Sequence, residues 1–220
     1  FTRMPSRNIV REFGEHEYYH VYNRGVEKRK IFLDERDYIV FLGLLKKYLA
    51  TEKPETKKLP RNANRHRPDK LIGEVEVLSY CLMPNHFHLL LYQTSKDGVH
   101  KLLRRVATSY SMYFNGRYNR VGGLFQGPYK ASRITRDGYL QHISRYIHLN
   151  PNEYQTWPFS SLRYYRGDKQ PPSWLKVEKI LQLFYDRKEY LDFVDDYVAV
   201  RNELQTLKFQ LANDLEKGEE

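Results

Sequence analysis

Two histidines two positions apart, His86 and His88, are residues whose type and spacing could do chemistry. On a β-strand, side chains alternate between the two faces, so both imidazoles would point the same way while Phe87 points into a core. Two imidazoles one pleat apart can share one metal ion. Two ligands do not complete a site, so a third oxygen or nitrogen ligand would have to come from elsewhere in the chain. The alternative is a pair of surface or structurally satisfied histidines.

A second group of candidate residues follows about 60 positions later, in the segment 138–150. Tyr139, Ile143, Tyr146 and Asn150 fall on one stripe of a helix, and the apolar Ile143 indicates that this stripe faces protein. The amide oxygen of Asn150 could ligate a metal, and the phenol of Tyr146 could attack phosphorus. The alternative makes Tyr146 a core aromatic and Asn150 a helix end before Pro151. His142, one turn from Tyr146, could be a base, a ligand or neither.

The elements that would position these residues can be read from periodicity. Strands are expected at 16–24, 74–81 and 86–92, the last two forming an antiparallel hairpin, and another short strand before Thr135. Helices are expected at 34–49, 99–114 and 137–150, followed by a helical tail. Strands and helices that alternate around an antiparallel hairpin predict an α+β fold.

The charge of the chain is uneven. Its 220 residues include 37 Lys/Arg and 27 Asp/Glu, a net charge of +10. The segment 176–220 has 7 basic and 11 acidic residues, which leaves 30 basic and 16 acidic residues in 1–175, a net of +14. A field of this size attracts polyanions, although a solvated basic surface would look the same. The candidates for phosphate contacts lie in the basic loop 57–70 and beyond it: Arg61, Arg65, Arg67, Arg104, Arg105 and Lys130.

Composition argues against several classes of protein. No apolar run approaches the roughly 18 residues that a membrane helix needs. Cys81 is the single cysteine, so no intramolecular disulfide can form, which fits a reducing compartment and predicts a cytoplasmic protein.

Several ordered motifs together resemble the single-tyrosine HUH transposases, and among them the REP-associated tyrosine transposases of bacteria most. His86-Phe87-His88 follows Met83-Pro84-Asn85, and Arg145-Tyr-Ile-His-Leu-Asn-Pro151 comes some 60 residues later. The segments 19–25, 123–131 and 157–161 are also similar to family segments. The resemblance covers about 5–166, with a looser echo at 190–194. Pro128 stands where relatives often carry a basic residue.

The resemblance implies a ferredoxin-like sandwich with an antiparallel central sheet. It implies a transposase domain at 5–170 and leaves an acidic helical extension at 171–220. It also implies roles for the candidate residues: His86, His88 and Asn150 as ligands of Mg²⁺ or Mn²⁺, and Tyr146 as the nucleophile.

The activity implied is metal-dependent transesterification of single-stranded DNA at the foot of a hairpin from a repetitive extragenic palindrome. Tyr146 would form a 5′-phosphotyrosine and release a 3′-OH, so that strands can be cut and joined without ATP. Two other functions stay open: a catalytically idle regulator that binds DNA or RNA hairpins, and a zinc hydrolase that uses the histidine pair. The protein would act as a monomer or as a homodimer.

Overall fold

The computed structural model describes residues 13–51, 70–134 and 137–197. Three of the expected phosphate contacts lie outside these residues: Arg61, Arg65 and Arg67. No helix in the described part of the chain is long and apolar enough to cross a membrane.

The centre of the protein is a four-stranded antiparallel sheet with the order β2-β3-β1-β4. Its strands are β1 (Glu17–Arg24), β2 (Val75–Met83), β3 (His86–Gln93) and β4 (Lys130–Ile134). α1 (Glu35–Leu49) connects β1 to β2, and α2 (Gly98–Arg117) connects β3 to β4. This β-α-β-β-α-β order in an antiparallel sheet is the ferredoxin-like arrangement, so the predicted α+β fold is confirmed.

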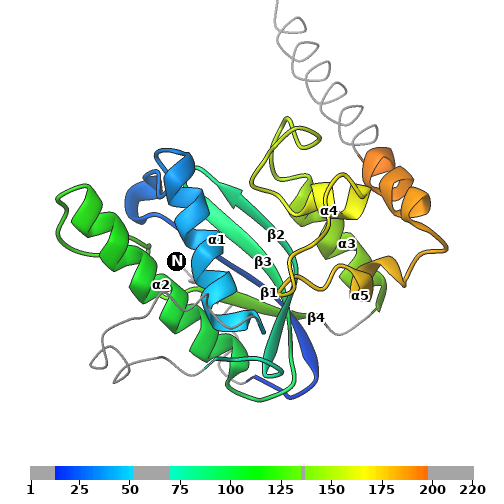
Figure 1. Ribbon diagram of the computed structural model, residues 1–220, viewed down its shortest axis with the longest axis horizontal. Helices are drawn as coiled ribbons and strands as arrows, with labels where there is room; N and C mark the ends of the chain where they lie inside the picture. The colour runs from blue at the N-terminus through cyan, green and yellow to red at the C-terminus, as the bar shows by residue number, and fades with distance from the viewer. Residues whose placement is uncertain (1–12, 52–69, 135–136, 198–220) are drawn as a thin grey trace, which may run out of the picture.

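The two faces of the sheet carry different helices (Figure 1). Phe87 of β3 packs against Phe41 of α1, with 5.1 Å between ring centroids. Its neighbour His88 points to the opposite face and meets Tyr146 of α3 (Asp137–His148). α1 and α2 therefore cover one face, and α3 covers the other.

The helix boundaries lie within three residues of the sequence expectations, and some of them have local causes. The carboxylate of Asp34 accepts a hydrogen bond from the backbone N–H of Asp37, so Asp34 caps α1, which begins one residue after the expected start at 34. α3 ends at His148, shortly before Pro151, which cannot continue a helix with its missing N–H.

The C-terminal part of the described chain packs beside α3. It contains α4 (Leu162–Arg166), α5 (Glu178–Leu181) and a helical segment at 187–197. Tyr190 and Val194 of that segment are buried in the core. The guanidinium of Arg145 on α3 lies 3.9 Å from the ring centroid of Phe193 and donates a 3.0 Å hydrogen bond to the Phe193 carbonyl. The segment 187–197 therefore holds the outer side of α3.

Candidate functional site

The alternation of β3 places His86 and His88 on the face of the sheet that α3 covers. Their ring centroids are 5.0 Å apart, with the ring planes perpendicular. The register of the sheet sets Arg24 of β1 opposite His86 and Tyr22 opposite His88. The sequence prediction that the two imidazoles share a face is therefore met in the fold.

His86 faces Asn150 across the gap between β3 and the end of α3. Nε2 of His86 lies 3.2 Å from Oδ1 of Asn150. The Asn150 amide is oriented by its Nδ2, which donates to the Tyr146 carbonyl at 3.2 Å. On the other side of the ring, Nδ1 of His86 lies 2.6 Å from Oδ1 of Asn85, whose Nδ2 donates to the Lys28 carbonyl.

These contacts fix the proton of His86. Both ring nitrogens of His86 face amide oxygens, which only accept, and a neutral ring carries one proton. That proton belongs on Nδ1, because its contact with Asn85 is the shorter, 2.6 Å against 3.2 Å between Nε2 and Asn150. Burial lowers the pKa of His86, and the positive charge of Arg24 lowers it further despite the contact with Asn150, so the ring is neutral at pH 7. The lone pair of Nε2 then faces the Asn150 oxygen without a proton between them. Two lone pairs that converge in this way are arranged as two ligands of one cation would be.

His88 is held by a histidine that the sequence analysis did not single out. Nδ1 of His88 lies 2.9 Å from Nε2 of His20 on β1, and the two rings stack. Burial lowers the pKa of His20 to about 4. Burial also lowers the pKa of His88, and the nearby imidazoles add to that shift. Both rings are thus neutral, and when Nδ1 of His88 donates, its Nε2 is free to bind a cation.

Tyr146 lies over this histidine pair. Its ring meets the rings of His20 and His88 edge-on, with centroids 5.8 and 5.6 Å away. The side chain remains 49% exposed, so it is not the core aromatic of the alternative reading. β3 and α3 therefore bring together the four residues that the sequence nominated for chemistry: His86, His88, Tyr146 and Asn150.

The donor set fits a divalent cation that accepts both nitrogen and oxygen. Two ligands bonded at right angles at about 2.0–2.1 Å lie about 3 Å apart, close to the separation of His86 Nε2 and Asn150 Oδ1. The described residues contain no group of three or more His, Cys, Asp and Glu side chains that could hold a metal. The candidate ligands found here are two histidines and an asparagine, so they differ from such a group in having an amide oxygen as the third ligand.

The other nominated residues have different positions. His142 is exposed on α3 and accepts a 2.8 Å hydrogen bond from Arg145, on the side of the helix near Phe193. Arg104 and Arg105 belong to α2, on the face of the sheet opposite Tyr146, and are not brought to the site. Lys130 begins β4, and its Nζ lies 5.9 Å from the ring centroid of Tyr22.

Sequence reasoning missed the contributions of β1. His20, Tyr22 and Arg24 share the face that carries His86 and His88, and Tyr22 stacks on His88 with 5.6 Å between centroids. A strand was expected at 16–24, and strand alternation alone places these three residues on one face. What could not be read was that this strand lies beside β3.

Residues 69–150 match the family described as IS200-like transposases. The resemblance inferred from the motifs is confirmed over this segment, which contains both histidines, Tyr146 and Asn150. No curated protein sequence matches the chain.

Two solved structures match this chain. A REP-associated tyrosine transposase bound to a REP hairpin is 14% identical, with 76% of this chain and 91% of that chain covered and a TM-score of 0.53. At this identity the likeness supports the fold alone. A putative transposase from Deinococcus radiodurans is 15% identical over 66% of this chain and 95% of that chain. Its TM-score is 0.36.

Proposed function

We propose that the protein is a metal-dependent, single-tyrosine endonuclease and strand transferase that acts on single-stranded DNA beside a hairpin. The observation that carries the proposal is the convergence of His86 Nε2 and the Asn150 oxygen beneath Tyr146, whose half-exposed ring contacts His88. A general transposase-like function is supported by the family match over 69–150. A hairpin substrate is suggested by the REP hairpin bound to the structurally similar transposase.

The residues would divide the reaction between them. His86, His88 and Asn150 would hold Mg²⁺ or Mn²⁺, which neutralises charge on the oxygens of the scissile phosphate. The phenolic oxygen of Tyr146 attacks phosphorus, and the bond between phosphorus and the 3′ oxygen breaks. The phenol gives up its proton, and the leaving 3′ oxygen takes one up. The new phosphotyrosine keeps the energy of the diester, so a second 3′-OH can reverse the step and join strands.

The test is the formation of a covalent adduct. The protein is incubated with Mn²⁺ and a labelled hairpin oligonucleotide with single-stranded flanks, taken from the DNA next to the gene, and resolved on a denaturing gel. We expect an adduct that Tyr146→Phe abolishes and that the control Tyr185→Phe retains, because Tyr185 is 95% exposed on the C-terminal segment. An adduct that survives in Tyr146→Phe would show that the nucleophile is another residue.

Metal dependence is tested on the same gel. His86→Ala and His88→Ala should lose the adduct while the affinity for the hairpin falls little, because these side chains would hold the metal and not the bulk of the DNA. If wild-type protein binds the hairpin tightly and never forms an adduct with Mn²⁺ or Mg²⁺, the alternative of an idle hairpin-binding regulator is favoured. Hydrolysis that needs zinc and is unaffected by Tyr146→Phe would instead favour a zinc hydrolase.

A further inference from the structure

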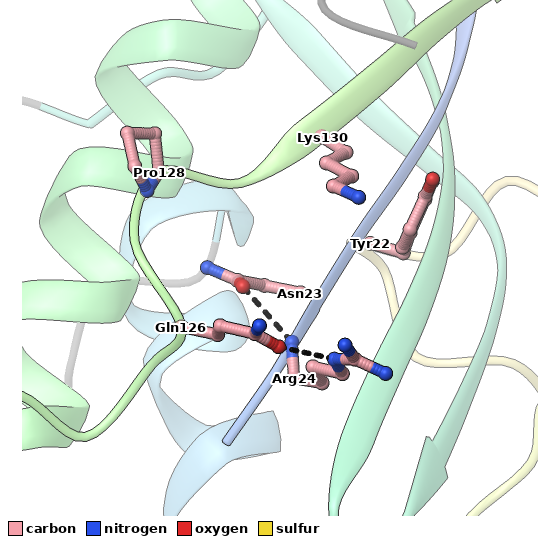
Figure 2. Close-up of a pocket in the computed structure, with 6 residues that line it drawn as sticks. All are labelled: Tyr22, Asn23, Arg24, Gln126, Pro128 and Lys130. Atoms are coloured by element: carbon pink, nitrogen blue, oxygen red, sulfur yellow. Dashed lines mark hydrogen bonds between the residues drawn. The ribbon is translucent and has the colours of Figure 1, made fainter. Parts of the chain in front are cut away.

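A cleft of about 230 Å³ lies between the end of β1 and the start of β4 (Figure 2). One wall is the end of β1, and the other is the segment that leads into β4. The residues that line it are Tyr22, Asn23, Arg24, Gln126, Pro128 and Lys130. This lining contains two cationic side chains and no carboxylate, so the cleft favours an anion.

Arg24 is presented to the cleft in a fixed orientation. Its Nε donates a hydrogen bond to Oε1 of Gln126 (Figure 2). In the part of the chain that the structure describes, neither terminal nitrogen of Arg24 forms a hydrogen bond or an ion pair. An arginine held through Nε keeps its two terminal nitrogens available, and that pair matches two oxygens of a phosphate.

Lys130 supplies a second cation at the same cleft. Its Nζ lies 5.9 Å from the centroid of the Tyr22 ring, and it forms no ion pair with a carboxylate of the described residues. Neither cation is therefore neutralised by a carboxylate. Pro128 stands where relatives often carry a basic residue, so Arg24 and Lys130 supply the positive charge of the cleft.

The walls of the cleft are pinned to each other by hydrogen bonds. Nδ2 of Asn23 donates to the Gly127 carbonyl at 3.1 Å, and the Gln126 N–H donates to the Arg24 carbonyl at 2.9 Å. The Asn23 oxygen also accepts from the N–H of Arg24 at 2.9 Å. Because both walls are fixed in this way, a ligand would not have to order the loop as it binds.

The cleft adjoins the candidate metal centre directly. Arg24 lies opposite His86 in the sheet, and Tyr22 lies opposite His88 and stacks on it. A polyanion whose reacting phosphate sits at His86 and His88 would bring a neighbouring phosphate to these two cations.

We propose that this cleft binds a phosphodiester of single-stranded DNA next to the reacting phosphate. The two terminal nitrogens of Arg24 would contact its oxygens, and Lys130 would supply a second positive charge. The proposal rests on the proposed function for the position of the reacting phosphate. It adds a binding subsite whose principal residue is Arg24.

The salt dependence of binding tests the subsite without any chemistry. Affinity for the single-stranded probe (dT)10 is measured in EDTA at several NaCl concentrations, with all variants in a Tyr146→Phe background. Each phosphate contact contributes about 0.7 to the slope of log affinity against log salt for single strands. We expect Arg24→Gln to reduce the slope by about 0.7. The control Arg36→Gln removes the same charge from an exposed position on α1, on the far face of the sheet, and should leave the slope unchanged.

A second variant tests the orientation of the Arg24 guanidinium separately from its charge. Gln126→Met keeps the size of the side chain and the charge of the cleft but removes the acceptor that holds Arg24. We expect the slope to stay at the parental value while the affinity at fixed salt falls severalfold. An unchanged affinity in Gln126→Met would contradict the claim that Gln126 orients Arg24 for phosphate binding.

Other results would also overturn the subsite. Equal slopes for Arg24→Gln and the parental protein would do so, as would equal losses in Arg24→Gln and Arg36→Gln. A blunt hairpin without single-stranded flanks serves as a further probe, and a loss seen with that hairpin but not with (dT)10 would assign Arg24 to duplex DNA.

The two proposals fail in distinguishable ways. If Arg24→Gln lowers the slope but wild-type protein forms no adduct, the subsite stands and the proposed reaction does not. If the adduct forms and the slope is unaffected, the reaction stands and the subsite does not.

Discussion

Nε2 of His20 lies 2.9 Å from Nδ1 of His88, and the two stacked rings join β1 to β3 beneath Tyr146. His88 is only 5% exposed, so this contact is shielded from water. The bond fixes the rotation of the His88 ring and, when His88 donates, directs its other nitrogen toward the gap between β3 and α3. His20 is therefore a positioning residue for the proposed metal centre.

The first prediction concerns the removal of this partner. His20→Leu should lower the affinity for Mn²⁺ by about 10- to 100-fold, the usual effect of losing the hydrogen-bond partner of a ligating histidine. His20→Gln should restore most of the affinity, because its amide oxygen can accept from Nδ1 of His88. Calorimetry on the DNA-free protein measures both.

The matched control is His100→Leu. His100 is exposed on α2, on the far side of the sheet, and its loss should leave Mn²⁺ affinity unchanged. If His20→Leu binds Mn²⁺ as tightly as His100→Leu does, His20 does not position the ligand.

The second prediction is that the nucleophile and the ligands act within one chain. The ring centroid of Tyr146 is 5.6 Å from that of His88 in the same chain, and Arg145 ties α3 to the C-terminal segment through the Phe193 carbonyl. A mixture of Tyr146→Phe protein with His86→Ala protein should therefore form no adduct. Restored adduct in the mixture would show that two chains exchange α3. Wild-type protein mixed with each variant serves as the control for inhibition.

The third prediction concerns a buried histidine near the end of the tyrosine helix. His148 lies 2.6 Å from the Tyr190 hydroxyl through Nδ1 and 2.7 Å from the Ser161 hydroxyl through Nε2. Burial keeps the ring neutral, so it donates through one of these nitrogens and accepts through the other. The ring thus connects α3 to two other parts of the chain.

Replacing this ring with an apolar side chain leaves two buried hydroxyls with one partner fewer. His148→Leu should lower the free energy of unfolding by about 2–6 kcal/mol, from about 1–3 kcal/mol for each of the two hydroxyls. His142→Leu, on the exposed side of the same helix, should change it by less than about 0.5 kcal/mol. Urea denaturation measures both, and equal effects would mean that the buried network contributes no stability of its own.

Local sequence patterns predicted the individual strands and helices of the site, but they did not predict which strands lie side by side. The alternation of β3 gave the shared face of His86 and His88, and Asp34 marked the start of α1, because both depend on residues close in sequence. The pairing of β1 with β3, which brings His20 and Arg24 to the site, is a long-range register that no single strand encodes.

Charge was the least informative pattern for placing the site. Arg104 and Arg105 contribute to the basic excess as much as Lys130 does, yet α2 carries them on the face away from Tyr146. Net charge indicates an anionic partner, but only the packing of helices on the sheet decides which cations surround the site. The proximity of Asn150 to His86 was likewise expected from the family resemblance and not from spacing alone.

The last prediction concerns Gly25, which closes the turn after β1. Its N–H donates to the Asn85 carbonyl at 2.9 Å, and a Cβ at this position would lie 2.2 Å from the Arg29 carbonyl oxygen. Gly25→Ala must therefore shift the backbone of the turn, which should cost about 1–3 kcal/mol of unfolding free energy. Because Asn85 also orients His86 through Nδ1, Mn²⁺ affinity should fall severalfold as well.

Gly43 provides the matched substitution. It lies within α1, is exposed, and a Cβ there would meet no atom within 4 Å. Gly43→Ala should raise the free energy of unfolding by about 0.5–1 kcal/mol, because alanine loses less backbone freedom in a helix, and it should leave Mn²⁺ affinity unchanged. The two alanine variants should therefore change stability in opposite directions in the same urea titration. A Gly25→Ala protein as stable as wild type, with unchanged Mn²⁺ affinity, would show that the turn after β1 does not support the ligand histidine.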